Sequence, residues 1–191
     1  MAGKKPTVSG MATHIPILEN LCKNYKFKTI VEFGMGNYST RLFLKQKCYL
    51  RSIETSEKWY KNVVESADYI TKFKWDAILT NCEIDRAFYF VTHYPALFLI
   101  DSADYANRYR FAEIAMDSIT SSGEVIIVIH DTEEKLYNYH KINLRNNILC
   151  DVMDFPIWTG VISRNKLDCI SEFEKIKIYN NDTIKDKLYL R

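Results

Sequence analysis

The sequence lacks several features that would assign it to a particular class of protein. Its 5 cysteines are scattered with no Cys-x-x-Cys pair, and no apolar run reaches the length of a membrane-spanning helix. The first residues lack the apolar core of a signal peptide. The net charge of +2 predicts no strong attraction to nucleic acid. We therefore expect reduced, partly buried thiols, a cytoplasmic location, no membrane contact and no strong nucleic-acid binding.

The length and composition indicate a single globular domain. The chain has 191 residues, of which 47% are hydrophobic and 26% charged, and it contains no internal repeat and no linker. We expect one domain over residues 1–191, with residues 1–12 mobile and residues 164–191 forming a polar C-terminal tail.

The segment 27–41 joins a strand, a glycine turn and the start of a helix. Residues 29–33 are β-branched, acidic or aromatic and predict a buried strand, which Gly34 and Gly36 then interrupt. Three polar residues are candidates to cap the helix that follows: Asn37, Ser39 and Thr40. Glycines let a ligand approach the main chain, and a helix N-terminus offers free N–H groups. The segment therefore predicts a backbone cradle for a ligand.

A second expected strand, 48–53, ends at Glu54. On the neighbouring strand of a βαβ unit, an acid at this position can accept hydrogen bonds from ribose hydroxyls. The alternative is that Glu54 merely precedes a surface helix over 56–66. Taken with the glycine turn, Glu54 favours a nucleoside pocket.

These motifs resemble the first two motifs of class I S-adenosylmethionine-dependent methyltransferases. The residues that carry the resemblance are Val31–Gly36, Ser39, Thr40 and Glu54. The resemblance implies an α/β fold with a Rossmann-like, doubly wound, mostly parallel sheet, and S-adenosylmethionine as cofactor with Glu32 near its amino group. The Rossmann dinucleotide fingerprint fits less well, because Ser39 stands where its third glycine should be.

The rest of the chain continues the alternation of strands and helices. Further strands are expected at 75–81, 96–100, 124–129, 148–153 and 158–163, and helices at 14–22, 56–66, 84–91, 110–119, 133–145 and 169–176. The last two strands predict an antiparallel C-terminal hairpin that closes the sheet. His14 directly precedes the first helix; we expect a surface histidine, the alternative being a segment that covers the cofactor or substrate.

Polar residues follow the expected strands at the edge where open α/β sheets bind ligands. They are Asn81, Asp101, His130 and Asp131. By the resemblance, Asn81 or Cys82 would contact the adenine, Asp101 and Asp131 would hold Mg²⁺ or Mn²⁺, and His130 would act as general base or ligand. The alternative is that Asn81 lies in an ordinary turn, while Asp131 or Thr132 caps the next helix and His130 has no role.

The resemblance extends over residues 27–163 and implies methyl transfer to a hydroxyl of a small molecule or sugar. The expected cofactor-binding residues are Glu32, Gly34, Gly36, Ser39, Glu54, Asn81 and Asp101, and the expected catalytic residues are Asp101, His130 and Asp131. Base methylation is disfavoured because the Asp/Asn-Pro-Pro-aromatic motif is missing. Arg108 and Arg110 either suit an anionic acceptor or are solvated charges. The alternative function is that of a protein that binds S-adenosylmethionine without methylating, as a lyase or as a regulatory or scaffold subunit.

Overall fold

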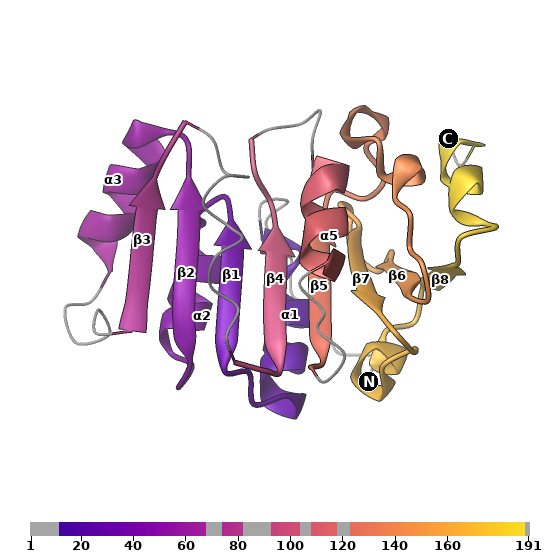
Figure 1. The fold of residues 1–191 in the computed structure, drawn as a ribbon, viewed down its shortest axis with the longest axis horizontal. Coiled ribbons are helices and arrows are strands. Elements are labelled where there is room, and N and C mark those ends of the chain that lie inside the picture. The colour runs from indigo at the N-terminus through magenta and orange to yellow at the C-terminus, as the bar shows by residue number, and fades with distance from the viewer. Residues whose placement is uncertain (1–11, 68–73, 82–92, 104–107, 118–122, 190–191) are drawn as a thin grey trace, which may run out of the picture.

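A computed structural model describes residues 12–67, 74–81, 93–103, 108–117 and 123–189. They form an eight-stranded sheet in the order β3-β2-β1-β4-β5-β7-β6-β8 (Figure 1). The strands are β1 (Thr29–Phe33), β2 (Tyr49–Glu54), β3 (Trp75–Leu79), β4 (Ala96–Ile100), β5 (Val125–His130), β6 (Ile148–Val152), β7 (Thr159–Ser163) and β8 (Ile176–Tyr179). Strands β1 to β5 run parallel, and β7 lies antiparallel between β5 and β6. The expected sheet, with its antiparallel C-terminal hairpin, is confirmed.

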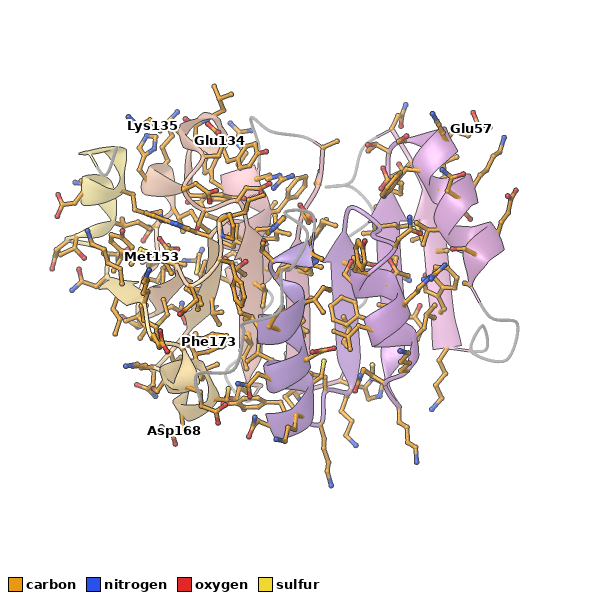
Figure 2. All side chains as sticks on the ribbon, turned by 180° about the vertical axis from the view of Figure 1, so that it is seen from behind. Glu57, Glu134, Lys135, Met153, Asp168 and Phe173 are labelled. Carbon is orange, nitrogen blue, oxygen red and sulfur yellow. The ribbon has the colours of Figure 1, made fainter. Side chains whose placement is uncertain are left out.

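Four α-helices are described: α1 (Ile15–Asn24), α2 (Ser39–Leu44), α3 (Glu57–Ser66) and α5 (Arg108–Asp117). Helices α1 and α2 pack on one face of the sheet, where Figure 2 shows them in front of the strands, and α5 packs on the other. Strands β1 and β4 are buried along their whole length because helices cover both faces. None of the helices in these segments is long and apolar enough to cross a membrane.

Two expectations about the second half of the chain are wrong. Instead of an α-helix over 133–145, the chain forms two short 3₁₀ turns, Lys135–Tyr137 and Tyr139–Lys141. Asn138 separates them with a φ of 57°, in the left-handed region, which an α-helix does not admit. Instead of a helix over 169–176, a 3₁₀ turn at Asp168–Glu172 leads into β8, which adds to the outer edge of β6. The helix expected over 84–91 and most of the mobile segment expected over 1–12 lie outside the described residues.

Candidate active site

The carboxyl ends of the central strands border a cavity of about 550 Å³. The expected site residues that line it are Gly34, Gly36, Ser39, Glu54 and Asp101. His14 and Arg108 also line it. A larger hollow of about 670 Å³ lies on the outer side of the molecule between α1, α2 and α3, but none of the residues expected for the site lines it. The smaller cavity is therefore the candidate active site.

The turn after β1 requires glycine at its first position. Gly34 has a φ of +83°, and a Cβ atom there would overlap the backbone of Asp101 and Ser102. The backbone N–H of Gly34 donates to the Ile53 carbonyl at 2.8 Å, which ties the turn to β2. At Gly36 a Cβ atom would meet a side chain instead, the Ser39 hydroxyl. Gly34 therefore lets the β1 turn touch the end of β4 directly.

Glu54 holds this turn and the start of α3 together. Its carboxylate accepts hydrogen bonds from the backbone N–H groups of Met35 at 3.0 Å, Thr55 at 2.8 Å and Ser56 at 2.7 Å. The Trp59 indole N–H donates to the Met35 carbonyl from α3, so that Met35 is held on both sides. A carboxylate has more acceptor positions than these bonds occupy, and Glu54 lines the cavity. It can therefore accept a further hydrogen bond from a ligand.

Glu32 lies beneath the turn, fully buried and surrounded by hydroxyl groups. It accepts hydrogen bonds from Ser39 at 2.5 Å, Thr40 at 2.7 Å and Ser52 at 2.7 Å. Burial raises the pKa of Glu32 to about 7, against the opposing effect of these three bonds. Ser39 and Thr40 thus bind Glu32 instead of capping α2, whose N-cap residue is Tyr38. Glu32 is not among the described residues that line the cavity, and it supports the turn from below.

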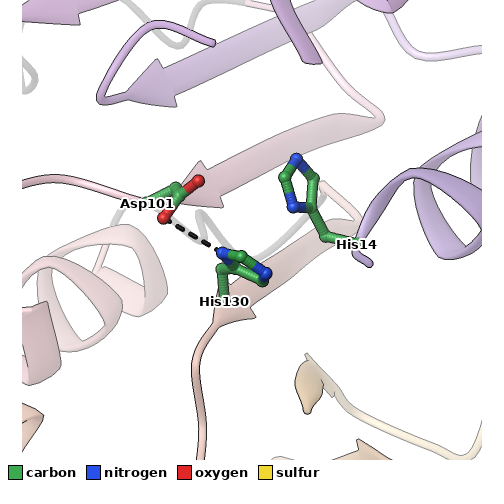
Figure 3. A group of neighbouring side chains, drawn as sticks. All are labelled: His14, Asp101 and His130. Atoms are coloured by element: carbon green, nitrogen blue, oxygen red, sulfur yellow. Dashed lines mark hydrogen bonds and ion pairs between the residues drawn. The ribbon is translucent and has the colours of Figure 1, made fainter. Parts of the chain in front are cut away.

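Two histidines and two aspartates cluster near the cavity, and two of the four, His14 and Asp101, line it. His130 Nδ1 lies 3.2 Å from Asp101 Oδ1 and 3.4 Å from Asp131 Oδ1, and His130 Nε2 lies 2.9 Å from the Thr13 hydroxyl. The ring of His14 stands edge-on to that of His130, with 4.4 Å between the ring centroids. Figure 3 shows His14, Asp101 and His130 converging from three separate segments. His14 is buried, so the expected surface histidine is wrong.

Arg108 connects the two aspartates. Its guanidinium lies 3.0 Å from Asp131 Oδ2 and 3.3 Å from Asp101 Oδ1, and its Nε donates to the Ser102 carbonyl at 2.5 Å. It also stacks on the Tyr137 ring, with 4.2 Å to the centroid. The side chain is only 4% exposed, so Arg108 is not a solvated charge, whereas Arg110 is exposed. The guanidinium places a positive charge beside both expected Mg²⁺ ligands.

These charges shift the pKa values of the cluster in opposite directions. Burial would raise the pKa of Asp101, but the hydrogen bond and charge of His130 and the charges of His14 and Arg108 lower it overall. Burial would lower the pKa of His130, but the bond to Asp101 and the charges of Asp101 and Asp131 raise it overall. Burial and the charge of His130 lower the pKa of His14 to about 4. At neutral pH His14 is therefore an uncharged imidazole.

Three of the remaining expected site residues, Asp131, His130 and Asn81, are not among the described residues that line the cavity. Asp131 adopts a left-handed φ of 58°, and since no α-helix follows it, it does not have the alternative role of a helix cap. His130 lies behind His14 and Asp101 and is not itself among the described residues that line the cavity. Asn81 is exposed and is likewise not among them. Cys82 lies outside the described residues.

The sequence matches no model of a known protein family and no curated protein. Its structure, however, matches solved structures over most of its length. An O-methyltransferase from Bacillus cereus, solved with S-adenosylhomocysteine, is 13% identical with a TM-score of 0.58, covering 85% of this chain and 84% of that one. The O-methyltransferase TomG of tomaymycin synthesis from Streptomyces achromogenes, solved with S-adenosylmethionine, is 11% identical with a TM-score of 0.58, covering 83% and 82%. An rRNA methylase from Streptococcus thermophilus is 13% identical with a TM-score of 0.59, covering 87% and 100%.

The chain has the class I methyltransferase fold. Similarity at these identities establishes the fold alone. Several residues that shape the cavity could not be assigned from the sequence, because their positions depend on contacts between distant segments. His14 and Arg108 are the clearest examples of such residues. The only feature of the sequence that pointed to a role for Arg108 was its position shortly after Asp101, the acid at a strand end.

Proposed function

We propose that the protein is an S-adenosylmethionine-dependent methyltransferase that acts on a hydroxyl of a small molecule or sugar. The observation that carries this proposal is that the glycine turn, Glu54 and Asp101 all face one cavity at the carboxyl edge of a sheet with the class I methyltransferase fold. Two proteins of similar structure were solved with S-adenosylmethionine or S-adenosylhomocysteine.

The chemistry of the cavity fits this cofactor. Gly34 and Gly36 both line the cavity, and Glu54 is placed to accept hydrogen bonds from ribose hydroxyls. Ser39 also lines the cavity, while Glu32 holds the turn from beneath. We retain Asn81 as a proposed adenine contact from the end of β3. When bound, the cofactor supplies an electrophilic methyl group on a positively charged sulfur, and the carboxylates of Glu54 and Asp101 favour that charge.

We assign Asp101, His130 and Asp131 to activation of the acceptor hydroxyl. Asp101 lines the cavity and holds His130, and Asp131 contacts the same ring nitrogen. Methyl transfer is an in-line displacement, so the residues that orient the hydroxyl supply much of the rate. Arg108 is already engaged by both aspartates, which favours a neutral acceptor over an anionic one.

Calorimetric titration with S-adenosylmethionine and S-adenosylhomocysteine tests the proposal. Both should bind, and Glu54→Ala should weaken binding by about 1–3 kcal/mol, the range for a lost hydrogen bond to a charged group. Glu57→Ala, on the exposed side of α3, is the matched control and should bind as the wild type does. Because Glu54 also holds the turn, Glu54→Gln and thermal melting separate lost binding from lost folding.

Unchanged affinity in folded Glu54→Ala protein would contradict the pocket assignment. Mass spectrometry after incubation with S-adenosylmethionine and no acceptor separates the alternatives. A methyltransferase should leave the cofactor intact, whereas a lyase should cleave it. Binding without turnover on any hydroxyl acceptor would favour the regulatory or scaffold alternative.

A further inference from the structure

His14 is a buried polar side chain whose ring nitrogens have no hydrogen-bond partner among the described residues. Only 2% of the residue is exposed. Leaving a buried polar group unpaired destabilises a folded protein. His14 also lines the cavity, and an ion held between its ring and the neighbouring side chains would satisfy one of its nitrogens.

Two further ligand-type side chains stand beside His14. One atom from each of His14, Asp101 and His130 can be chosen so that all three lie within 4.8 Å of one another. His14 comes from the residue before α1, Asp101 from the end of β4, and His130 from the end of β5, as Figure 3 shows. Ligands around a tetrahedral ion at ~2.1 Å are ~3.4 Å from one another, so ion binding requires the three side chains to move closer by up to about 1.4 Å.

We propose that His14, Asp101 and His130 form a binding site for a divalent transition-metal ion such as Zn²⁺. Two imidazoles and one carboxylate are a donor set typical of zinc and of non-haem iron. Mg²⁺ and Ca²⁺ instead require mostly oxygen ligands. The site differs from a Mg²⁺ site between Asp101 and Asp131 both in its ligands and in the ion that it selects.

The surroundings of His130 prepare it to be a ligand. Its Nδ1 faces Asp101, while its Nε2 lies 2.9 Å from the Thr13 hydroxyl. A proton on Nε2, donated to Thr13, leaves the Nδ1 lone pair free on the side of Asp101 and His14. Hydrogen bonds of this kind commonly fix the orientation and tautomer of metal-bound histidines.

The charges near the site also favour a cation. Asp101 and Asp131 both lie beside His130, and Glu54 lines the same cavity. Arg108 opposes this field with a single positive charge. The ion would take the place of the proton between His130 and Asp101, and the cavity side of the site stays open to a ligand.

An ion here would assist the proposed methyl transfer by activating the acceptor, since a metal lowers the pKa of a bound hydroxyl. That consequence rests on the proposed function, but the binding of the ion does not. The two can therefore be tested separately, with metal alone and with S-adenosylmethionine alone.

The test is calorimetric titration of chelator-treated protein with ZnCl₂ in the presence of a non-thiol reductant, with MgCl₂ titrated in parallel. We expect one Zn²⁺ to bind per chain and Mg²⁺ to bind at least about a hundredfold more weakly. His14→Ala should weaken Zn²⁺ binding at least about tenfold. His140→Ala, in the 3₁₀ turn Tyr139–Lys141, is the matched control and should leave Zn²⁺ affinity unchanged.

Absorption spectra of the Co²⁺-loaded protein give a second readout that does not depend on activity. The visible bands of a low-coordinate Co²⁺ site should appear in the wild type and be lost in His14→Ala and Asp101→Asn. Equal Zn²⁺ affinity in wild type and His14→Ala, or no Zn²⁺ binding by the wild type, would overturn the proposal. If the wild type binds S-adenosylmethionine but not Zn²⁺, the metal site is overturned and the proposed function stands. If it binds Zn²⁺ but not S-adenosylmethionine, the proposed function is contradicted and the metal site stands.

Discussion

Two carboxyl groups near the cavity, Glu32 beneath the glycine turn and Asp101 at the end of β4, are held in opposite ways. Glu32 on β1 is surrounded by three neutral hydroxyl donors, and its pKa is raised to about 7. Asp101, which follows the neighbouring strand β4, faces Arg108 and His130, and its pKa is lowered. Hydroxyl groups orient a carboxyl group in either protonation state, whereas nearby cations favour its ionised form.

This difference separates a hydrogen-bonded region at the glycine turn from a charged cluster around Asp101. Below the glycine turn, the three hydroxyls around Glu32 are fixed to it, and Glu54 is bonded to three backbone N–H groups. Across the cavity, His14 has no partner among the described residues, and the charges of Asp101, Asp131 and Arg108 are concentrated in a small volume. The hydrogen bonds around the glycine turn hold its shape, whereas the cluster around Asp101 holds charges.

The sharpest test of this comparison is Arg108→Met, which removes the guanidinium from the charged cluster around Asp101. It would leave Asp101 and Asp131 largely buried without their partner, and breaking such a pair costs about 3–5 kcal/mol. Urea denaturation measures the change. Arg110→Met is the control on the same helix; Arg110 is exposed, so the effect should stay within about 0.5 kcal/mol. Similar effects of the two substitutions would show that Arg108 does not organise the charged cluster.

At the glycine turn, the largest effect is expected from Gly34→Ala. The added Cβ atom meets the backbone of Asp101 and Ser102, and the residue keeps a φ that disfavours side chains. We expect a loss of about 3 kcal/mol in the free energy of unfolding. Gly36→Ala is the matched comparison, because its Cβ meets only the movable Ser39 hydroxyl, and its loss should be clearly smaller. A reversed order would mean that the turn does not depend on its approach to β4.

The pH dependence of Glu32→Gln separates the two kinds of carboxyl group. The pKa of Glu32 is raised from 4.5 to about 7, so the folded protein keeps a proton that the unfolded chain releases between those values. The contribution of Glu32 to stability should therefore fall as pH rises through this window, by up to about 3 kcal/mol. Denaturation of wild type and Glu32→Gln at pH 4.5 and pH 8 measures this change. A stability difference that is the same at both pH values would show that Glu32 stays ionised, like Asp101.

Local patterns were sufficient to predict the centre of the fold. The buried strands β4 and β5 are short runs of almost entirely apolar residues, β1 is mostly β-branched and aromatic, and the glycines after β1 mark the turn. Because the ends of parallel strands share one edge, the sequence also predicted that Glu54, Asp101 and His130 lie near one another. The edge strand β8 was missed because its alternation of apolar and polar residues extends over only 4 residues, too few to distinguish a strand within a polar segment.

The structure changed the interpretation of the charged and polar residues most. The sequence placed His14 before a helix and Arg108 near another helix start, where both types of residue are usually solvated. Packing buries His14 against His130 and holds Arg108 between Asp101 and Asp131. No local pattern encodes these contacts, since their partners lie far away in the chain.

The sequence by itself determined the order of the strands from β1 to β7, the glycine turn and the set of polar residues at the strand ends. These follow from side-chain periodicity and from the conformations that individual residues allow. Only the tertiary structure decided which polar groups meet, which of them are buried, and how their charges shift one another. Those properties depend on distance and on exclusion of water, and both arise only when segments as distant as His14 and His130 are packed together.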